Sequence, residues 1–211
     1  CVMFLFFSSS ALSQNQSGIE GQIQFATSIP SSYQLGRMVH QIRNDTAQYA
    51  DALDLMALIN DQKKYMGAAM TLCNELSSRY QCSRVSLGWV EDNYVRVQAI
   101  SHIEKFQKKM DAVQSLEAAM EEALDQDEEI LWPQPEGNSA VTREHESFAK
   151  EQGGAFVLSL PIRVDNEPVG ILMCERQENR YSEEEIRGLR VHCDQTARRV
   201  ADLKRFDRWF G

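Results

Sequence analysis

The hydrophobic residues between positions 35 and 59 recur at helical spacing, with steps of three, four or seven residues. This spacing puts apolar side chains on one face of an α-helix, and it predicts a helix roughly 37 Å long at 1.5 Å per residue. The residues that set this pattern are Met38, Ile42, Tyr49, Leu53, Met56 and Ile59. A second helical stretch follows within residues 62–80, where the apolar face is formed by Met66, Met70, Cys73, Leu76 and Tyr80.

From residue 82 the hydrophobic period changes to two, which is typical of strands. Residues 84–100 read as a β-hairpin, with a turn at residues 91–93. The alternation places Trp89 with Leu87, on the face opposite Ser86 and Gly88. A second hairpin is predicted in residues 155–176, and a short strand in residues 128–131.

Three further helices are expected, in residues 103–124, 142–152 and from 182 onward. The last begins with Ser182 and Glu185 at the spacing of a capping box. Its apolar stripe is formed by Ile186, Leu189, Cys193, Val200 and Leu203. Hairpins flanked by helices predict an α+β fold with a central antiparallel sheet, and the long N- and C-terminal helices are expected to pack together.

The pattern divides the chain into four segments. Residues 1–34 are rich in Gln, Ser and Gly and are expected to be flexible or docked on a partner, with a signal or membrane-proximal tail in residues 1–13 as the alternative. Residues 35–61 are expected to form an N-terminal signalling or dimerisation helix, residues 62–205 the domain, and residues 206–211 the start of a linker to a downstream region.

Four segments occur in order along this domain: CSRVSLGW (82–89), SLPI (159–162), NEPVGIL (166–172) and YSEEEI (181–186). Together they resemble the corresponding segments of GAF domains, a ligand-sensing fold of signalling proteins. The resemblance covers residues 62–205. The whole stretch also resembles the GAF regions that precede the membrane segment of HlyD-like efflux adaptor proteins, which implies a membrane-adaptor or output region of the same chain as a partner.

The resemblance implies a ligand pocket between the sheet and residues 103–154. Small or polar strand residues, together with a hydrogen-bonding group and an aromatic lid, are the candidate lining. These candidates are Ser86, Gly88, Gln98, His102, Trp132 and Ser159. No cofactor is predicted, and the expected ligand is an unidentified small molecule. In the alternative interpretation Trp132 fills the core and no ligand binds.

Catalytic and metal-binding patterns are weak in this sequence. The four histidines do not have the spacing of metal ligands, and His145, between acidic residues, is interpreted as part of a solvated helix face. The five cysteines contain no CxxC pair. We therefore expect no catalytic residues and no metal. A thiol-based redox sensor, or an enzyme similar to free methionine sulfoxide reductases, is the alternative, with Cys73, Cys82 and Cys174 as its thiols.

Charge narrows the range of partners. The chain has 22 Lys and Arg against 31 Asp and Glu, a net charge of −9, which disfavours nucleic-acid binding. No apolar run reaches the roughly 20 residues of a membrane span. The acidic balance and the dispersed cysteines favour the cytoplasm, with tethering to a membrane through other regions left open. Many acids gather in residues 111–129, as a solvated face or a surface for a basic partner.

The terminal helices are the predicted surface between two copies of the chain. The candidate interface residues are Met38, Ile42, Tyr49, Met56, Val200, Leu203 and Phe210. The sequence therefore predicts a non-catalytic sensory or regulatory module that works as a homodimer and relays through its terminal helices. The alternative is a purely structural dimerisation module without a ligand.

Overall fold

The computed structural model describes residues 16–104 and 111–210. The contacts between Cα atoms divide the chain into two compact units, Cys1–Ala47 and Gln48–Gly211. Helix α2 (Gln16–Asn60) runs through the first unit and into the second. Residues 16–34 are therefore helical, within the segment 1–34 that was expected to be flexible or docked on a partner. Their Gly, Ser and Pro residues are weak helix formers, so the local sequence does not predict this extension.

The described part of the second unit contains a five-stranded antiparallel sheet in the order β2-β1-β5-β4-β3. The strands are β1 (Arg84–Glu91), β2 (Tyr94–Ile100), β3 (Ile130–Trp132), β4 (Phe156–Val164) and β5 (Glu167–Arg176). The β1–β2 and β4–β5 hairpins were both predicted. Their turns carry two residues each with positive φ, Asp92 and Asn93 in one and Asp165 and Asn166 in the other. This is the geometry of type I′ turns, which Asn and Asp tolerate.

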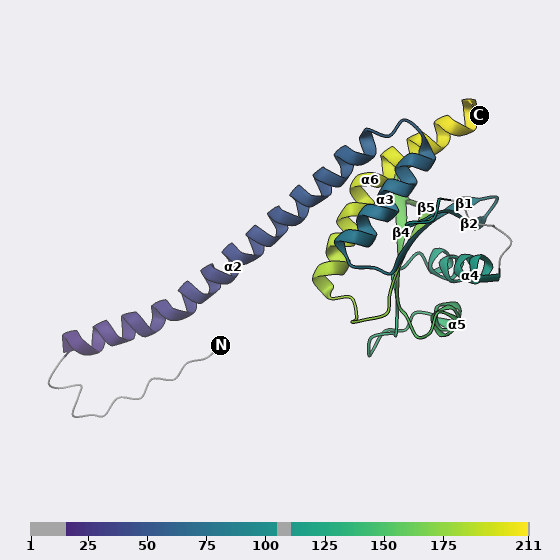
Figure 1. Ribbon diagram of the computed structural model, residues 1–211. Helices are drawn as coiled ribbons and strands as arrows, with labels where there is room; N and C mark the ends of the chain where they lie inside the picture. The colour runs from purple at the N-terminus through teal and green to yellow at the C-terminus, as the bar shows by residue number, and fades with distance from the viewer. Residues whose placement is uncertain (1–15, 105–110, 211) are drawn as a thin grey trace. The chain divides into compact units, whose positions relative to one another are not determined.

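Helices cover both faces of this sheet (Figure 1). Helices α3 (Tyr65–Arg79) and α6 (Glu183–Phe210) lie side by side on one face, and α4 (Asp111–Gln126) and α5 (Arg143–Glu151) lie on the other. The α+β prediction is thus confirmed, and the capping box at the start of α6 is present, with Ser182 and Glu185 exchanging hydrogen bonds of 2.7 and 3.2 Å. Helix α6 continues to Phe210, past the linker boundary expected at residue 206.

Two hydrophobic clusters follow from the alternation along the strands. The first lies under α3 and α6 and includes Leu87 and Trp89, as predicted, together with Leu55 and Ile59 from the end of α2. The second lies under α4 and α5 and includes Met120, Phe148 and Met173. The sheet therefore separates two independent packing layers.

Carboxylates of α4 cover the exposed edge of the sheet at β2. Glu117 Oε1 accepts a hydrogen bond from the Val97 amide at 2.9 Å, and Glu121 Oε1 accepts one from the Val95 amide at 3.0 Å. Part of the acidic segment 111–129 thus pairs with backbone donors that an edge strand otherwise leaves free. Among the helices in the described ranges, none combines the length and the apolar character needed to cross a membrane.

Candidate functional site

Three of the predicted pocket residues do lie together, on the sheet face covered by α4 and α5. Ser86 of β1 and Ser159 of β4 flank Met173 of β5 in one row, because both are paired with Met173 across the strands. Gly88 lies two residues further along β1, opposite Ile171. Both serines are fully buried, and the hydroxyl of Ser86 has no hydrogen-bond partner. This is the face on which a small molecule was expected.

The space beside Gly88 is filled by a methionine of α4. A Cβ atom added to Gly88 would lie 2.6 Å from Met120 Sδ and 2.5 Å from Val95 Cγ1. Both distances are shorter than van der Waals contact, so the missing side chain leaves no free volume here. Met120 itself is fully buried. The structure thus shows this part of the face packed rather than open.

A buried chain of hydrogen bonds crosses the same face from α4 to β4. His145 Nδ1 lies 2.6 Å from Glu122 Oε2, and His145 Nε2 lies 2.8 Å from Ser159 Oγ. The Glu122 carboxylate also accepts the backbone amides of Glu144 and His145 at 2.9 and 3.1 Å, so it caps the first turn of α5. His145 is fully buried, and its interpretation as part of a solvated helix face is wrong.

Burial favours the neutral form of this histidine. Desolvation lowers the pKa of His145, against the hydrogen bond and charge of Glu122, which raise it. In the neutral imidazole Nδ1–H donates to the carboxylate, and Nε2 accepts the Ser159 hydroxyl proton. The order serine–histidine–carboxylate matches that of a hydrolytic triad. Ser159 is fully buried, however, so its oxygen meets side chains rather than solvent. The arrangement as it stands tethers α4 and α5 to the sheet.

Two of the predicted pocket residues lie elsewhere. Gln98 faces the opposite layer, where its Oε1 accepts a hydrogen bond from Lys204 Nζ of α6 at 2.7 Å. His102 lies in the turn after β2, is exposed, and donates its backbone N–H to Asn74 at 2.7 Å. An irregularity in the β1–β2 register between Leu87 and Gly88 shifts the alternation in this hairpin, which simple counting along the sequence does not anticipate.

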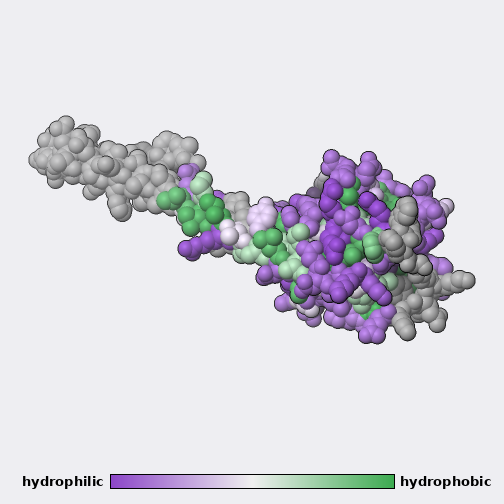
Figure 2. All heavy atoms as spheres, turned by 90° about the horizontal axis from the view of Figure 1, so that it is seen from above, coloured by the Kyte–Doolittle hydropathy of each residue, from purple (hydrophilic) through white to green (hydrophobic). Residues whose placement is uncertain are grey.

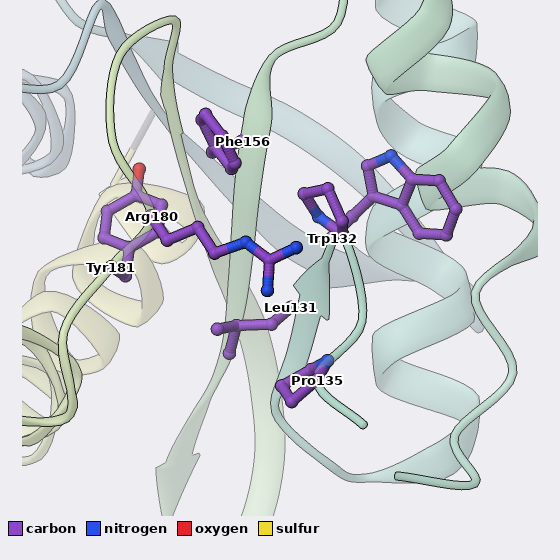
Figure 3. A pocket seen from close by; sticks show the side chains of 7 residues that line it. Leu131, Trp132, Pro135, Phe156, Arg180 and Tyr181 are labelled. Atoms are coloured by element: carbon purple, nitrogen blue, oxygen red, sulfur yellow. The ribbon is translucent and has the colours of Figure 1, made fainter. Parts of the chain in front are cut away.

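Trp132 lies at the wall of a small pocket at the β3 edge of the sheet. This pocket holds about 140 Å³ and is lined by Leu131, Trp132, Pro133, Pro135, Phe156, Arg180 and Tyr181. Figure 3 shows the Arg180 guanidinium reaching into it between Leu131 and Trp132, while the indole ring points away from the guanidinium. Trp132 is half-buried against the α4/α5 cluster. The volume is below the roughly 300 Å³ of ordinary small-molecule pockets.

The predicted interface residues divide into two groups. Met38, Ile42 and Tyr49 are exposed on α2, and Met56 is half-buried. Val200 and Leu203 are buried in the α3/α6 cluster, so they pack inside their own domain and the prediction that they contact a second copy is wrong. The side chain of Phe210 lies outside the described residues. The stripe on α6 reflects intramolecular packing because the helix lies flat on the sheet.

Metal ligands do not gather in the described ranges. Within residues 16–104 and 111–210, no group of three or more His, Cys, Asp and Glu side chains could hold a metal ion. Sequence reasoning missed the buried position of His145 and its hydrogen bonds to Glu122 and Ser159. A signal for it was the apolar pair Phe148 and Ala149 at helical spacing, which marks the buried face of α5.

The sheet order and the helical layers define an α+β domain with a central antiparallel sheet, and the family model for the GAF domain matches residues 67–200. The chain therefore belongs to the GAF domain family. Members of this family are typically sensory or regulatory modules, and the resemblance seen in the sequence is confirmed for the domain itself.

Solved structures with the same fold are distant in sequence. The GAF domain of a phosphoenolpyruvate-protein phosphotransferase from Acinetobacter is 12% identical, with a TM-score of 0.59 over 77% of this chain and 98% of that one. The corresponding domain from Coxiella burnetii is 15% identical, with a TM-score of 0.57 over 76% and 96%. Free methionine-R-sulfoxide reductase from Neisseria meningitidis is 8% identical, with a TM-score of 0.54 over 75% and 90%. At these identities the likeness concerns the fold alone.

No curated protein sequence matches the chain. The family model and the structures named above do not support the efflux-adaptor context expected from the sequence. Family and fold are therefore established, and the input and output of this module have to be argued from its own residues.

Proposed function

We propose that the chain is a non-catalytic regulatory GAF module that forms a homodimer through α2 and passes signals between α2 and α6. The observation that carries this proposal is the run of exposed apolar residues on α2. A regulatory domain needs an element that joins it to a second copy or to an output region, and α2 has the surface for the first role.

The exposed apolar residues of α2 are spaced by three, four or seven residues, which places them on one face of the helix. Leu35, Met38 and Ile42 belong to the first unit, and Tyr49 and Leu53 continue the spacing in the second; all five side chains are more than half exposed. Figure 2 shows hydrophobic residues at the surface of this helix. Exposed large apolar side chains at this spacing are typical of helices that pair with another helix. A second copy of the chain offers the same surface, so we take it as the partner.

Within the second unit, the end of α2 has another apolar face, and that one is already covered. Ala52, Leu55 and Ile59 are buried against the domain, whereas Leu53 is exposed. The helix thus has one face for its own domain and a different face for a partner. Pairing of two copies would not compete with the packing of α2 on its own domain.

Polar contacts connect the end of α2 to α6. The carboxylate of Asp51 pairs with Arg79 of α3, and its other oxygen lies 3.1 Å from His192 Nε2 of α6. Gln48 Nε2 donates to the Glu184 carbonyl at 3.4 Å. A displacement of α2 in the dimer would therefore change contacts at the start and in the middle of α6. These contacts support a relay between the two helices.

The second candidate is a dimerisation module that binds no small molecule. The packing of Met120 and Val95 at Gly88 favours it, because a ligand on this face would have to displace Met120. Native mass spectrometry of the full chain separates the two. A dimer that carries an added mass supports the sensor, a dimer without one favours the dimerisation module, and a monomer contradicts both.

Substitutions on α2 test the dimer directly. Ile42→Asp places a charge in the exposed stripe, whereas Ala47→Asp places the same charge at an exposed position outside it. Burying one Ile gives about 1.5–3 kcal/mol, and each dimer contains two, so we expect Ile42→Asp to weaken dimerisation roughly 100-fold or more. Sedimentation equilibrium measures this change. If both variants dimerise as the parent does, the α2 interface is incorrect.

The cytoplasmic location, the downstream output region and the efflux-adaptor context remain predictions from the sequence. We retain the first as part of this proposal, because the buried cysteines of the described ranges are free thiols, as in reducing compartments. Separation of cell fractions followed by detection of the chain would test it.

A further inference from the structure

A small pocket lies where the edge strand β3 meets the loop between β5 and α6 (Figure 3). It holds about 140 Å³. Its walls are apolar or aromatic and include Leu131, Trp132, Phe156 and Tyr181, together with two prolines of the loop that follows β3. Arg180 is the one charged residue of the lining. The lining shares no residue with the row of buried serines on the α4/α5 face, so this is a separate site.

The Arg180 guanidinium reaches into this pocket between Leu131 and Trp132 (Figure 3). No hydrogen bond or ion pair joins it to another residue in the described part of the chain. None of the residues that line the pocket is acidic. A guanidinium presents five N–H donors in a planar fork that matches the two oxygens of a carboxylate. The pocket therefore offers a positive charge for which its own walls supply no negative partner.

Contacts on both sides hold the walls of the pocket in place. Gln134 Nε2 donates to the Ala140 carbonyl at 3.0 Å, which closes the loop that follows β3. On the other side, Tyr181 is buried, and the Arg176 guanidinium lies 3.9 Å from the centre of its ring. The backbone that carries Arg180 is thus fixed at the next residue. A site that is already formed costs a ligand little ordering of the protein.

The volume limits the size of the ligand. An apolar cavity of about 150 Å³ is large enough to hold benzene, which has about six non-hydrogen atoms. In a carboxylic acid of that size, the carboxylate takes three atoms and leaves an apolar tail of about three carbons. A phosphate is a poorer match because it carries up to two negative charges, whereas Arg180 is the only cation of the lining.

We propose that this pocket binds a short aliphatic monocarboxylate of about three to five carbons. The carboxylate accepts hydrogen bonds from the Arg180 guanidinium, and the tail packs against Leu131 and Phe156. The pocket ends at Tyr181, next to the Ser182 that caps α6, so the ligand lies at the start of that helix. The inference goes beyond the function proposed above, because the site does not involve α2 and does not depend on dimerisation.

The test is a titration of the isotope-labelled full chain with sodium butyrate at constant ionic strength, followed by amide NMR. We expect saturable shifts of the Leu131, Phe156 and Tyr181 amide signals. Butyramide has the same size but no charge, so it should bind at least ~10-fold more weakly, because a charge-assisted hydrogen bond is lost. Octanoate should bind no more tightly than butyrate, because its tail is longer than the pocket.

Two arginine variants separate the pocket from general attraction of anions. Arg180→Gln removes the charge from the pocket, and butyrate should bind to it at least ~10-fold more weakly. The matched control Arg187→Gln removes the same charge at an exposed position of α6 that does not line the pocket, and it should bind butyrate as the parent does. Both arginines are exposed, so both variants should fold, and their amide spectra verify this.

Three results would overturn the proposal. The first is the absence of saturable shifts at roughly 100 mM butyrate, a concentration that fills any site of millimolar affinity. The second is equal binding of butyrate and butyramide, and the third is an equal loss of affinity in the two arginine variants. Dimer mass, measured separately, decides the proposed function, so the two can fail independently.

Discussion

His145 illustrates how a single side chain can be misread from its neighbours. It stands between Glu144 and Glu146, which suggests a solvated face, yet it is fully buried and connects Glu122 to Ser159. Its environment is set by a residue of α4 and a residue of β4 rather than by the adjacent sequence. The pairing of a buried imidazole with a buried carboxylate has a consequence for the pH dependence of stability.

We expect the free energy of unfolding to fall as the pH drops below about 6.5, the ordinary pKa of histidine. Because the folded chain lowers the pKa of His145, the unfolded chain binds this proton first, and acid favours unfolding. The stabilisation that comes from the lowered pKa of His145 is fully present above pH 6.5. Below that pH the free energy of unfolding falls by up to about 1.4 kcal/mol for each pH unit. Urea unfolding from pH 7.5 to 5.5 measures it.

The control for this prediction is His145→Gln. We expect this variant to be less stable by about 1–3 kcal/mol at pH 7.5, because it leaves buried partners incompletely bonded. The free energy of unfolding of this variant should depend less steeply on pH than that of the parent, because the variant lacks the imidazole while the other titrating groups are common to both chains. Parallel pH curves for the two chains would show that His145 is not the group responsible.

At the scale of elements, the packing of α4 on the sheet closes the expected pocket. The closest approach is between Met120 of α4 and Gly88 of β1, where no room remains for a Cβ atom. A methionine can move more readily than a branched side chain, so this contact is where the two elements could separate. Substitution of either residue measures how this contact affects the free energy of unfolding.

We expect Gly88→Ala to lower the free energy of unfolding by about 1–3 kcal/mol, the usual cost of overpacking a core. Met120→Ala alone should cost about 2–5 kcal/mol through the cavity it leaves. In the double variant the new methyl group occupies part of that cavity, so the combined loss should be smaller than the sum. Urea unfolding of all four chains tests this. Additive losses would mean that Met120 does not fill the space beside Gly88.

The elements that could be predicted from the sequence are those determined by neighbouring residues. Hairpin turns and the α6 capping box rest on local residues, such as Asp92, Asn93 and Ser182, and they were predicted correctly. The placement of Gln98 was not, because a register irregularity in β1–β2 shifts the alternation. The role of the α4 carboxylates was missed as well, because Glu117 and Glu121 pair with the backbone of a strand 20 and 26 residues earlier in the sequence.

At the scale of the whole molecule, the sequence predicted a domain boundary at residue 62, whereas the contacts place it at Gln48. The difference is the last part of α2. Leu55 and Ile59 are fully buried in the cluster under α3 and α6, although the sequence assigned residues 35–61 to a separate signalling or dimerisation helix. Apolar periodicity reports which face is buried, but it does not distinguish burial in the same domain from burial in a partner.

This difference gives a prediction about truncated chains. All residues of both hydrophobic clusters lie at or after Leu55, so we expect residues 48–211 to fold alone, with the urea dependence of the full-length domain. A fragment of residues 62–211 lacks Leu55 and Ile59, and the loss of two buried aliphatic side chains should cost about 3–6 kcal/mol. Urea unfolding of the two fragments side by side measures this difference.

The two fragments also bear on the role of α2. Residues 48–211 lack Leu35, Met38 and Ile42, which lie in the exposed stripe, but keep the face that packs on the domain. Such a fragment should be as stable as the parent yet monomeric, which would separate the dimerising part of α2 from its structural part. If the 48–211 fragment dimerises as tightly as the full chain, the interface must lie in the domain itself. If the 62–211 fragment is as stable as the 48–211 fragment, the folded domain begins at residue 62 as the sequence predicted.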